Sequence, residues 1–115
     1  TSGCTREAID FSNFIDEFKL SNTVVVGVSK DSVSSHDKFC KKHNLKIDLL
    51  SDEDLVICKA FGVWQEKSMY GKTYMGISRS TFLINETGIV KYTWPKVKVN
   101  GHAEDVFALV KKNDI

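Results

Sequence analysis

The stretch from Thr23 to Ser29 reads Thr-Val-Val-Val-Gly-Val-Ser, and this stretch decides the fold class. It is rich in β-branched residues and apolar on both faces, which is typical of a strand buried in a parallel sheet. The next three residues, Lys30-Asp31-Ser32, end the strand and offer caps for a helix that we expect over residues 33–43. A buried strand that leads directly into a helix predicts an α/β layered domain.

The segment before this strand reads as a helix over residues 3–20. Its apolar residues recur at spacings of three and four, which places them on one stripe, and charged residues take the other side. Thr1 or Ser2 can cap the start of this helix. A helix that opens an α/β unit normally follows a strand on which it packs, so we expect at least one central strand to lie outside this sequence. The apolar stripe consists of Ala8, Phe11, Phe14, Ile15 and Phe18.

The segment after residue 43 contains shorter elements, and the turn Asn85-Glu86-Thr87-Gly88 joins two of its strands, with Gly88 supplying a positive φ. The order of elements predicts a single domain over residues 1–115, an α/β unit with a mixed sheet flanked by helices. The expected elements are an extended piece over 45–50, a short helix over 55–61 after the acidic run 51–54, a loop over 64–76, strands over 77–84 and 89–94, and a helix over 103–112.

The composition is that of an ordinary globular domain. Of 115 residues, 42% are hydrophobic and 27% are charged, and the net charge is +1. This balance gives no argument for nucleic acid or an acidic membrane as a partner. The apolar runs stay far below the roughly 18 residues that a membrane-spanning helix needs. Three lysines lie near two aromatic residues in the stretch Lys91 to Lys98, and this pattern fits a solvated strand face better than a nucleic-acid surface.

The three cysteines, Cys4, Cys40 and Cys58, are too few and too widely spaced for the disulfide framework of a small secreted domain. They fit a reducing compartment such as the cytoplasm. The chain has no Cys-x-x-Cys pair, which argues against a disulfide oxidoreductase of the thioredoxin kind. His36 and His43 stand seven residues apart without a close acidic or cysteine partner, so we expect neither a metal site nor a cofactor.

Cys4 is the first candidate for a functional residue because it falls in the first turn of the first helix. The unpaired N–H groups and partial positive charge of a helix start favour a thiolate, which is the nucleophilic form of cysteine. Arg79, which leads into a strand, is a cation that could hold a thiolate and a small oxyanion together. The local pattern leaves the alternatives open, namely a packed structural cysteine and a solubilising charge at the edge of a strand.

Cys40 and Cys58 are the other two thiols. Cys40 lies on the second helix, next to Lys41 and Lys42, and can be either a packing residue or a second thiol that attacks an oxidised Cys4. Cys58 lies on a short helix with apolar neighbours, and we interpret it as a core residue.

Taken together, these residues resemble the Q-type peroxiredoxins, also called bacterioferritin comigratory proteins. The stretch Thr1-Ser2-Gly3-Cys4-Thr5-Arg6-Glu7-Ala8 resembles the Thr-Pro-Gly-Cys-Thr-x-Glu-Ala motif of that family. The resemblance covers essentially the whole chain, in order and without large gaps. It implies a thioredoxin-like fold and the reduction of hydrogen peroxide and organic hydroperoxides without a metal. The likeness continues through residues 26–32, 49–52, 61–64, 70–77, 79–84 and 94–103.

The resemblance also assigns roles to individual residues. It implies that Cys4 is the peroxidatic cysteine, that Thr1 supplies a hydroxyl to the sulfur and the peroxide, and that Arg79 activates the thiol. One branch of the family places a resolving cysteine on the second helix, where Cys40 matches it. In that case the two helices must unwind locally before a Cys4–Cys40 bond can form. The implied partners are a hydroperoxide and a thioredoxin-like reductant, and we expect a monomer.

Three departures from the family pattern qualify these expectations. Ser2 replaces a proline, and Ile9 stands where many members carry a resolving cysteine. The third departure concerns the family's segment before Thr1, which includes strands and a proline that shields the thiolate. We expect the chain to be an N-terminally incomplete peroxiredoxin domain without that segment. The alternative function is an inactive fragment or degenerate member that serves as a folded interaction module.

Overall fold

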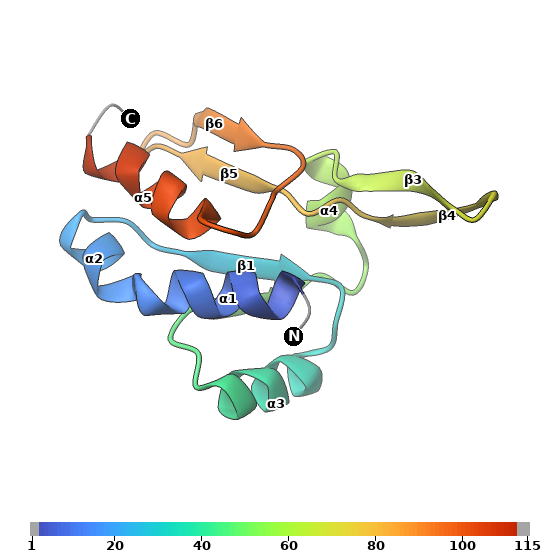
Figure 1. The fold of residues 1–115 in the computed structure, drawn as a ribbon, viewed down its shortest axis with the longest axis horizontal. Helices are drawn as coiled ribbons and strands as arrows, with labels where there is room; N and C mark the ends of the chain where they lie inside the picture. Colours follow the sequence, from blue (N-terminus) through green and yellow to red (C-terminus); the bar gives the residue numbers. More distant parts are fainter. Residues whose placement is uncertain (1–2, 113–115) are drawn as a thin grey trace.

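The computed structural model describes residues 3–112, in which helices and strands alternate along the chain (Figure 1). This alternation is the α/β organisation that the sequence predicts. The elements in chain order are α1 (Gly3–Asn13), α2 (Ile15–Leu20), β1 (Val26–Ser29), α3 (Val33–His43), β2 (Asp48–Ser51), α4 (Val56–Ala60), β3 (Trp64–Met69), β4 (Lys72–Ile77), β5 (Thr81–Ile84), β6 (Val90–Trp94) and α5 (His102–Lys111).

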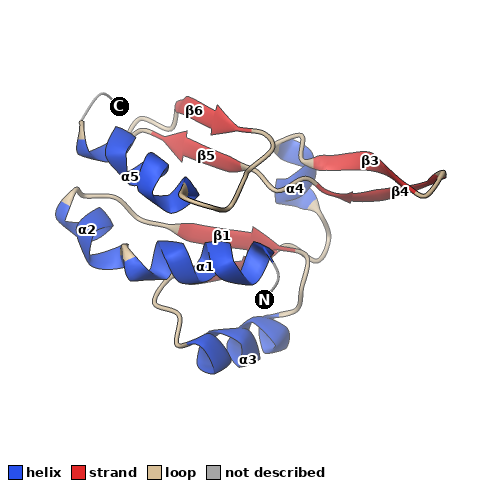
Figure 2. Ribbon diagram, in the orientation of Figure 1, coloured by secondary structure: helices blue, strands red, loops and turns tan. Residues whose placement is uncertain are grey.

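The strands within the described residues form three two-stranded sheets (Figure 2). The β1–β2 pair is parallel, with Val26 opposite Asp48, whereas the β3–β4 and β5–β6 pairs are antiparallel. Parallel and antiparallel pairing therefore both occur, as expected of a mixed architecture, but in short separate ladders. Helix α3 packs against β2, and α1 and α2 pack against α5.

The strand expected over residues 23–29 begins only at Val26, and the prediction that both of its faces are buried is wrong. Val24 is 78% exposed, and Val26 and Val28 are 44% and 40% exposed. Val25 instead packs against the core. The physical reason is that, within residues 3–112, β1 pairs only with β2, and the core lies on one side of that pair.

The helix expected over residues 3–20 is in fact two helices, α1 and α2, which are separated at Phe14. Phe14 has φ −96° and ψ 6°, and its N–H donates to the carbonyl of Phe11. The apolar period continues across the break, so periodicity alone gives no sign of it. Packing explains the break, because Phe14 lies against Phe107 of α5 with ring centroids 5.8 Å apart.

No helix in the described part of the chain has the length and apolar character to cross a membrane.

The core lies between α1, α2 and α5, where the predicted apolar stripe is confirmed. Phe18 is 1% exposed and its ring meets those of Phe11 and Phe107, with centroids 6.0 and 5.4 Å apart. Full burial of a phenylalanine side chain contributes about 2–3 kcal/mol. The buried Ser12 hydroxyl accepts the Lys46 N–H at 2.7 Å, which ties α1 to the segment that leads into β2. This cluster fixes α1, and with it the position of Cys4.

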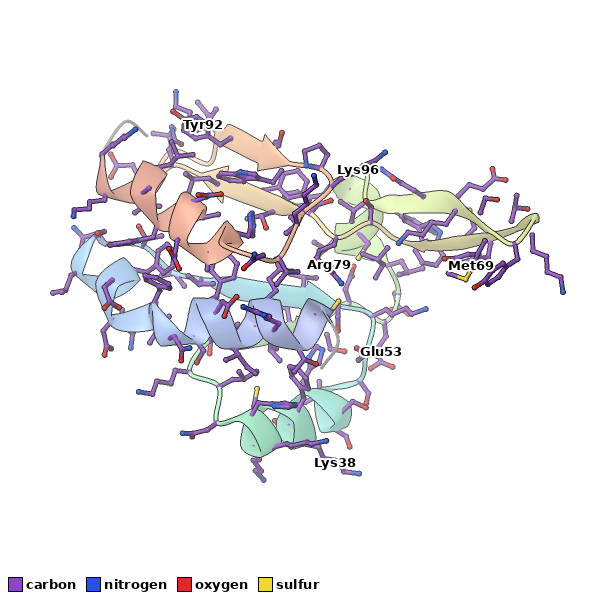
Figure 3. The ribbon with its side chains drawn as sticks, viewed as in Figure 1. Lys38, Glu53, Met69, Arg79, Tyr92 and Lys96 are labelled. Carbon is purple, nitrogen blue, oxygen red and sulfur yellow. The ribbon has the colours of Figure 1, made fainter. Side chains whose placement is uncertain are left out.

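The segment over residues 64–76, for which the sequence predicts a loop, is the hairpin β3–β4, so that prediction is wrong. The hairpin projects from the body of the molecule (Figure 1), and Met69 lies near its tip (Figure 3). Tyr70 and Gly71 form its two-residue turn with φ 53° and 77°. Such turns usually carry Asn or Asp at the first position. Because Tyr70 occupies that position, the sequence does not show the residue pattern that predicts such a turn.

The strand expected over residues 77–84 is also interrupted, because β4 ends at Ile77 and β5 begins at Thr81. The first of the three residues between the strands, Ser78, still donates its N–H to the Val63 carbonyl beside β3. The Ser78 and Ser80 hydroxyls bond the segment after β6. Arg79 is the middle residue of this link. The break therefore frees Arg79 from a strand geometry and directs it toward α1.

The remaining elements follow the prediction closely. Helix α3 has the expected bounds, α5 starts one residue early, and the extended piece expected over 45–50 forms β2 three residues later. Gly88 has φ 87° in the turn between β5 and β6. The acidic run supports the short helix α4, since the Asp52 carboxylate accepts the N–H groups of Ile57 and Cys58.

Candidate active site

Cys4 lies in the first turn of α1, and its side chain is exposed to solvent. At this position the thiol is close to the unpaired N–H groups and the partial positive charge of the helix start. An exposed sulfur at a helix start is accessible to a small electrophile. The structure therefore places the first candidate residue as the sequence predicts.

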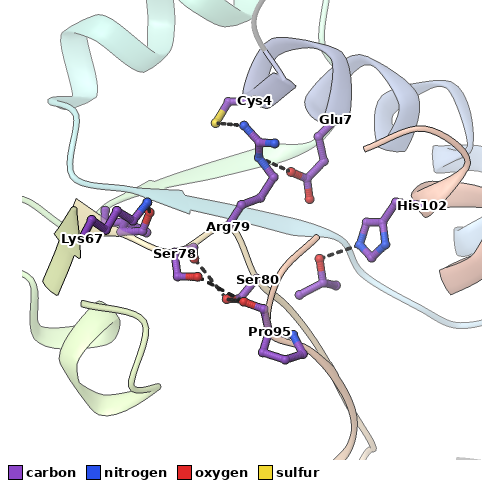
Figure 4. Close-up of polar contacts among 10 residues, drawn as sticks. Cys4, Glu7, Lys67, Ser78, Arg79, Ser80, Pro95 and His102 are labelled. Atoms are coloured by element: carbon purple, nitrogen blue, oxygen red, sulfur yellow. Dashed lines mark hydrogen bonds and ion pairs between the residues drawn. The ribbon is translucent and has the colours of Figure 1, made fainter. Parts of the chain in front are cut away.

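Arg79 points from the link between β4 and β5 toward the start of α1 (Figure 3). Its Nη2–H donates a hydrogen bond to Cys4 Sγ over 3.4 Å (Figure 4). The two residues are 75 positions apart in the sequence, and the fold brings them together. A guanidinium that faces a sulfur favours its ionised form and leaves further N–H groups for an oxyanion. The alternative role for Arg79, a solubilising charge at a strand edge, does not fit this contact.

Gly3 explains how the guanidinium can approach the helix so closely. A Cβ at this position would lie 2.7 Å from both Nη atoms of Arg79 and 2.9 Å from its Cζ. Carbon atoms do not approach other heavy atoms this closely without displacing them. The glycine before Cys4 therefore leaves the space that the arginine occupies.

Glu7 also contacts Arg79, and it is not among the candidates that the sequence predicts. It lies one helical turn after Cys4, and its Oε2 forms an ion pair with Arg79 Nε over 3.6 Å (Figure 4). Burial raises the pKa of Glu7, and the nearby Arg79 and a hydrogen bond from Thr81 partly oppose this effect. Glu7 and Cys4 thus flank the same guanidinium. The sequence signal that could have pointed to Glu7 is its i, i+3 spacing from Cys4, which puts Cys4 and Glu7 on one face of a helix.

The backbone around Arg79 is also held in place. The hydroxyls of Ser78 and Ser80 both donate to the carbonyl of Pro95 over 3.1 Å, and the Val97 N–H donates to the carbonyl of Arg79 over 3.0 Å. Two hydroxyls and one amide thus fix the link on both sides of the arginine. A fixed link orients the guanidinium before any substrate arrives.

Cys40 is not part of this cluster. It is half-buried on α3 and lines a cavity of about 470 Å³ between α3 and β2, together with His36 and Leu49. Cys4 and Cys40 are both free thiols, and no hydrogen bond joins them within the described residues. The structure therefore brings Cys4 and Arg79 together and places Cys40 on α3, at the cavity beside β2. Thr1, the other predicted site residue, lies outside the described residues, as does the predicted helix cap at Thr1 or Ser2.

Cys58 is confirmed as a core residue with 3% exposure. Burial raises the pKa of its thiol to about 11, and the adjacent Asp52 carboxylate contributes to this rise. The pKa of Asp52 shifts the other way: burial alone would raise it, but hydrogen bonds from the α4 backbone outweigh burial and lower it. A thiol that stays protonated inside the core is neither a nucleophile nor a metal ligand. Within residues 3–112 no three His, Cys, Asp or Glu side chains are grouped as metal ligands.

Known proteins with a similar sequence or structure carry the same kind of fold. The chain matches the AhpC/TSA family over residues 1–93. The peroxiredoxin Bcp of Xanthomonas campestris is 50% identical over 111 residues, which are 96% of this chain and 69% of that protein. A structure of the X. campestris bacterioferritin comigratory protein, described for its alkyl peroxide reduction activity, matches with a TM-score of 0.93 and 47% identity. It covers 98% of this chain and 72% of that one.

A cysteine variant of Xylella fastidiosa PrxQ gives a TM-score of 0.94 at 44% identity, over 100% of this chain and 71% of that chain. The chain therefore belongs to the AhpC/TSA family and has its thioredoxin-like fold. Within that family it is a member of the Bcp/PrxQ peroxiredoxins, which are thiol peroxidases. The comparisons support an enzyme and do not support the alternative of an inactive interaction module.

Proposed function

We propose that Cys4 is the peroxidatic cysteine of this peroxidase and that Arg79 is the residue that activates it. The observation that carries the proposal is the 3.4 Å hydrogen bond from Arg79 to the exposed Cys4 sulfur at a helix start. Helix start and guanidinium both favour negative charge at the same atom. The flanking Glu7 and the clamped backbone hold the guanidinium in this place.

The reaction begins when the Cys4 thiolate attacks one oxygen of the hydroperoxide in line with the O–O bond. A new S–O bond forms as the O–O bond breaks, so the sulfur is oxidised to a sulfenic acid and the peroxide is reduced. The second oxygen leaves as hydroxide or alkoxide and takes up a proton to become water or alcohol. Arg79 stabilises the negative charge that develops on this leaving oxygen. Thr1 is the proposed hydroxyl contact of the sulfur and the peroxide.

Cys40 is the proposed resolving cysteine. Its sulfur attacks the Cys4 sulfenic acid, a disulfide forms and water leaves. The two cysteines are free and lie on different helices, and we propose that the ends of α1 and α3 unwind before a disulfide of normal geometry forms. Support comes from two structures of X. campestris peroxiredoxin Q with single cysteine-to-serine changes. The changed positions are separated by as many residues as Cys4 and Cys40 are here.

Organic hydroperoxides are the proposed substrates beside hydrogen peroxide, in line with the alkyl peroxide reduction described for the X. campestris relative. Thioredoxin or a similar dithiol is the proposed reductant of the Cys4–Cys40 disulfide. We further propose that the protein is a monomer in the cytoplasm. Three cysteines without a disulfide framework fit a reducing compartment.

Stopped-flow tryptophan fluorescence during reaction with hydrogen peroxide tests the assignment of Cys4. Cys4→Ser removes the nucleophile, so we expect the rapid fluorescence change and peroxide consumption to disappear. Cys58→Ser is the matched control, because it removes a thiol that the core already keeps unreactive, and it should retain both signals. Peroxide consumption by Cys4→Ser at the parent rate would rule out Cys4 as the peroxidatic residue.

Peptide mass spectrometry after one equivalent of peroxide tests the role of Cys40. We expect a disulfide-linked pair of peptides that contain Cys4 and Cys40, and a lasting Cys4 sulfenic acid in Cys40→Ser. A stable sulfenic acid in the parent protein would instead show an enzyme with one catalytic cysteine that depends on an external thiol.

A further inference from the structure

Behind the active-site arginine lies a buried histidine. His102 is 4% exposed at the start of α5, and the Phe11 and Trp94 rings meet it edge-on with centroids 5.7 and 5.5 Å away. Its Nε2 lies 2.7 Å from the Thr81 hydroxyl (Figure 4). A polar side chain in aromatic surroundings is costly unless its hydrogen bonds are made. The Thr81 contact is therefore a specific feature of this part of the core.

Thr81 connects this histidine to the active site. Its side chain also acts on the Glu7 carboxyl, whose pKa it lowers. The Oε2 of that carboxyl forms an ion pair with Arg79 Nε over 3.6 Å. Arg79 in turn donates to Cys4 over 3.4 Å. The polar groups thus follow one another from α5, through β5 and α1, to the Cys4 sulfur, with a hydrogen bond at each end and the Glu7–Arg79 ion pair between them.

Only one assignment of hydrogen-bond donors and acceptors is consistent along this series of polar groups. A threonine hydroxyl carries one proton, and an ionised carboxylate only accepts. When Thr81 gives its proton to Glu7, its oxygen must accept from a protonated Nε2 of His102. Burial lowers the pKa of His102, although Asp105 opposes this effect, so the imidazole favours its neutral form with one N–H. That N–H is then the one directed at Thr81.

We propose that His102 is a positioning residue for Arg79, which acts through Thr81 and Glu7 to hold the guanidinium against Cys4. The proposal rests on the proposed roles of Cys4 and Arg79. The His102 N–H fixes the orientation of the Thr81 hydroxyl, and this hydroxyl fixes the carboxylate that faces Arg79 Nε. In a buried network each such bond strengthens the next.

The competing explanation is that His102 only fills space between Phe11 and Trp94. His102→Phe separates the two roles, since it keeps an aromatic ring and removes the N–H. Thr81→Val is the second test variant, because it has nearly the same shape and lacks the hydroxyl. The structural control is the urea midpoint of each variant, which shows whether the core remains folded.

The experiment measures the rate of Cys4 alkylation by iodoacetamide as a function of pH, with the full chain. We expect His102→Phe and Thr81→Val each to slow alkylation at neutral pH by about three- to tenfold, the effect of one hydrogen bond. The midpoint of the pH–rate profile should move to higher pH. His102→Gln, which can donate to Thr81 through its amide, should recover part of the rate.

A double-mutant cycle gives the decisive comparison. In an Arg79→Ala background, His102→Phe should have no further effect on Cys4 alkylation, because the path through Arg79 is already broken. An undiminished effect in that background, or a folded His102→Phe protein with the parent profile, would overturn the inference. A parent Cys4 that reacts no faster than free cysteine would instead contradict the proposed function itself.

Discussion

Cys4 and Cys58 occupy similar places in the backbone but different surroundings. Both lie near the start of a helix, Cys4 in α1 and Cys58 as the third residue of α4. Cys4 is exposed and faces the Arg79 guanidinium, whereas Cys58 is buried and faces the Asp52 carboxylate. Burial, together with the Asp52 carboxylate, raises the pKa of Cys58 to about 11.

The comparison teaches that a helix start alone does not make a cysteine reactive. The helix dipole acts on both sulfurs and is worth well under a few kcal/mol. The nearest charged side chain and access to solvent decide which sulfur becomes a nucleophile. With the proposed role of Cys4, the same chain carries a reactive thiol and an inert one.

The largest expected effect comes from removing the cation that distinguishes Cys4. Arg79→Ala should lower the rate constant for reaction with hydrogen peroxide by about 10²-fold or more, as for loss of a preorganised charge donor. The rate constant of Arg79→Lys should lie between those of the parent protein and Arg79→Ala, because an ammonium group keeps the positive charge and lacks the planar array of N–H donors. Stopped-flow kinetics under excess peroxide measure these rates. Equal rates for all three proteins would remove Arg79 from the mechanism.

A smaller effect is expected from Gly3→Ala, which keeps every charge and changes only the space at the helix start. The added methyl group would lie 2.7 Å from the guanidinium nitrogens, so Arg79 must move away. We expect about a tenfold loss of peroxidase rate from this displacement. Far-UV circular dichroism should show an unchanged helix content, since alanine favours helices. An unchanged rate would mean that the arginine tolerates another position.

Glu7→Gln should separate activity from stability. Burial raises the pKa of Glu7, so its ionised form is disfavoured in the folded protein. The stability that the protonated carboxyl provides is full below pH 4.5 and is lost as pH rises through the folded pKa. At pH 7 glutamine should therefore leave the unfolding free energy unchanged or higher, while peroxidase activity falls by about three- to tenfold. A lower urea midpoint for Glu7→Gln together with full peroxidase activity would show that Glu7 stabilises the fold and does not support the reaction.

The smallest effect concerns Cys58 and alkaline pH. Its thiol is neutral in the folded state up to a pKa of about 11, against 9.0 for an ordinary cysteine. Its contribution to stability is therefore complete below pH 9 and declines as pH rises toward 11, by about 1 kcal/mol between pH 9 and 10. Urea unfolding at these two pH values should show a shallower decline for Cys58→Ala than for the parent. Parallel declines would mean that Cys58 titrates normally.

The sequence predicts those parts of the fold in which local pattern and packing agree. The apolar stripe that includes Phe11 and Phe18, the helix over residues 33–43 and the turn at Gly88 are all found in the structure. The hairpin β3–β4 was missed because Tyr70 occupies a positive-φ turn position that sequence statistics assign to other residues. The break at Phe14 was missed because contact with Phe107, a residue far along the chain, determines it.

The candidate site divides in the same way. The local sequence makes both Cys4 and Arg79 candidates and leaves their structural alternatives open, and the family resemblance favours the functional role for both. The contact between them spans 75 residues and depends on the clamp at Pro95, which no local pattern encodes. Glu7 was overlooked because a carboxylate on a helix face is ordinarily a solvated charge. Its role follows only from the position of Arg79.

Competitive alkylation of all three cysteines in one sample tests the central claim most directly. A limiting amount of iodoacetamide is added to the folded protein at pH 6.5, and quantitative peptide mass spectrometry reads the modification of Cys4, Cys40 and Cys58. We predict that Cys4 carries most of the label and that Cys58 carries essentially none. Label on Cys40 or Cys58 that equals or exceeds the label on Cys4 would contradict the account.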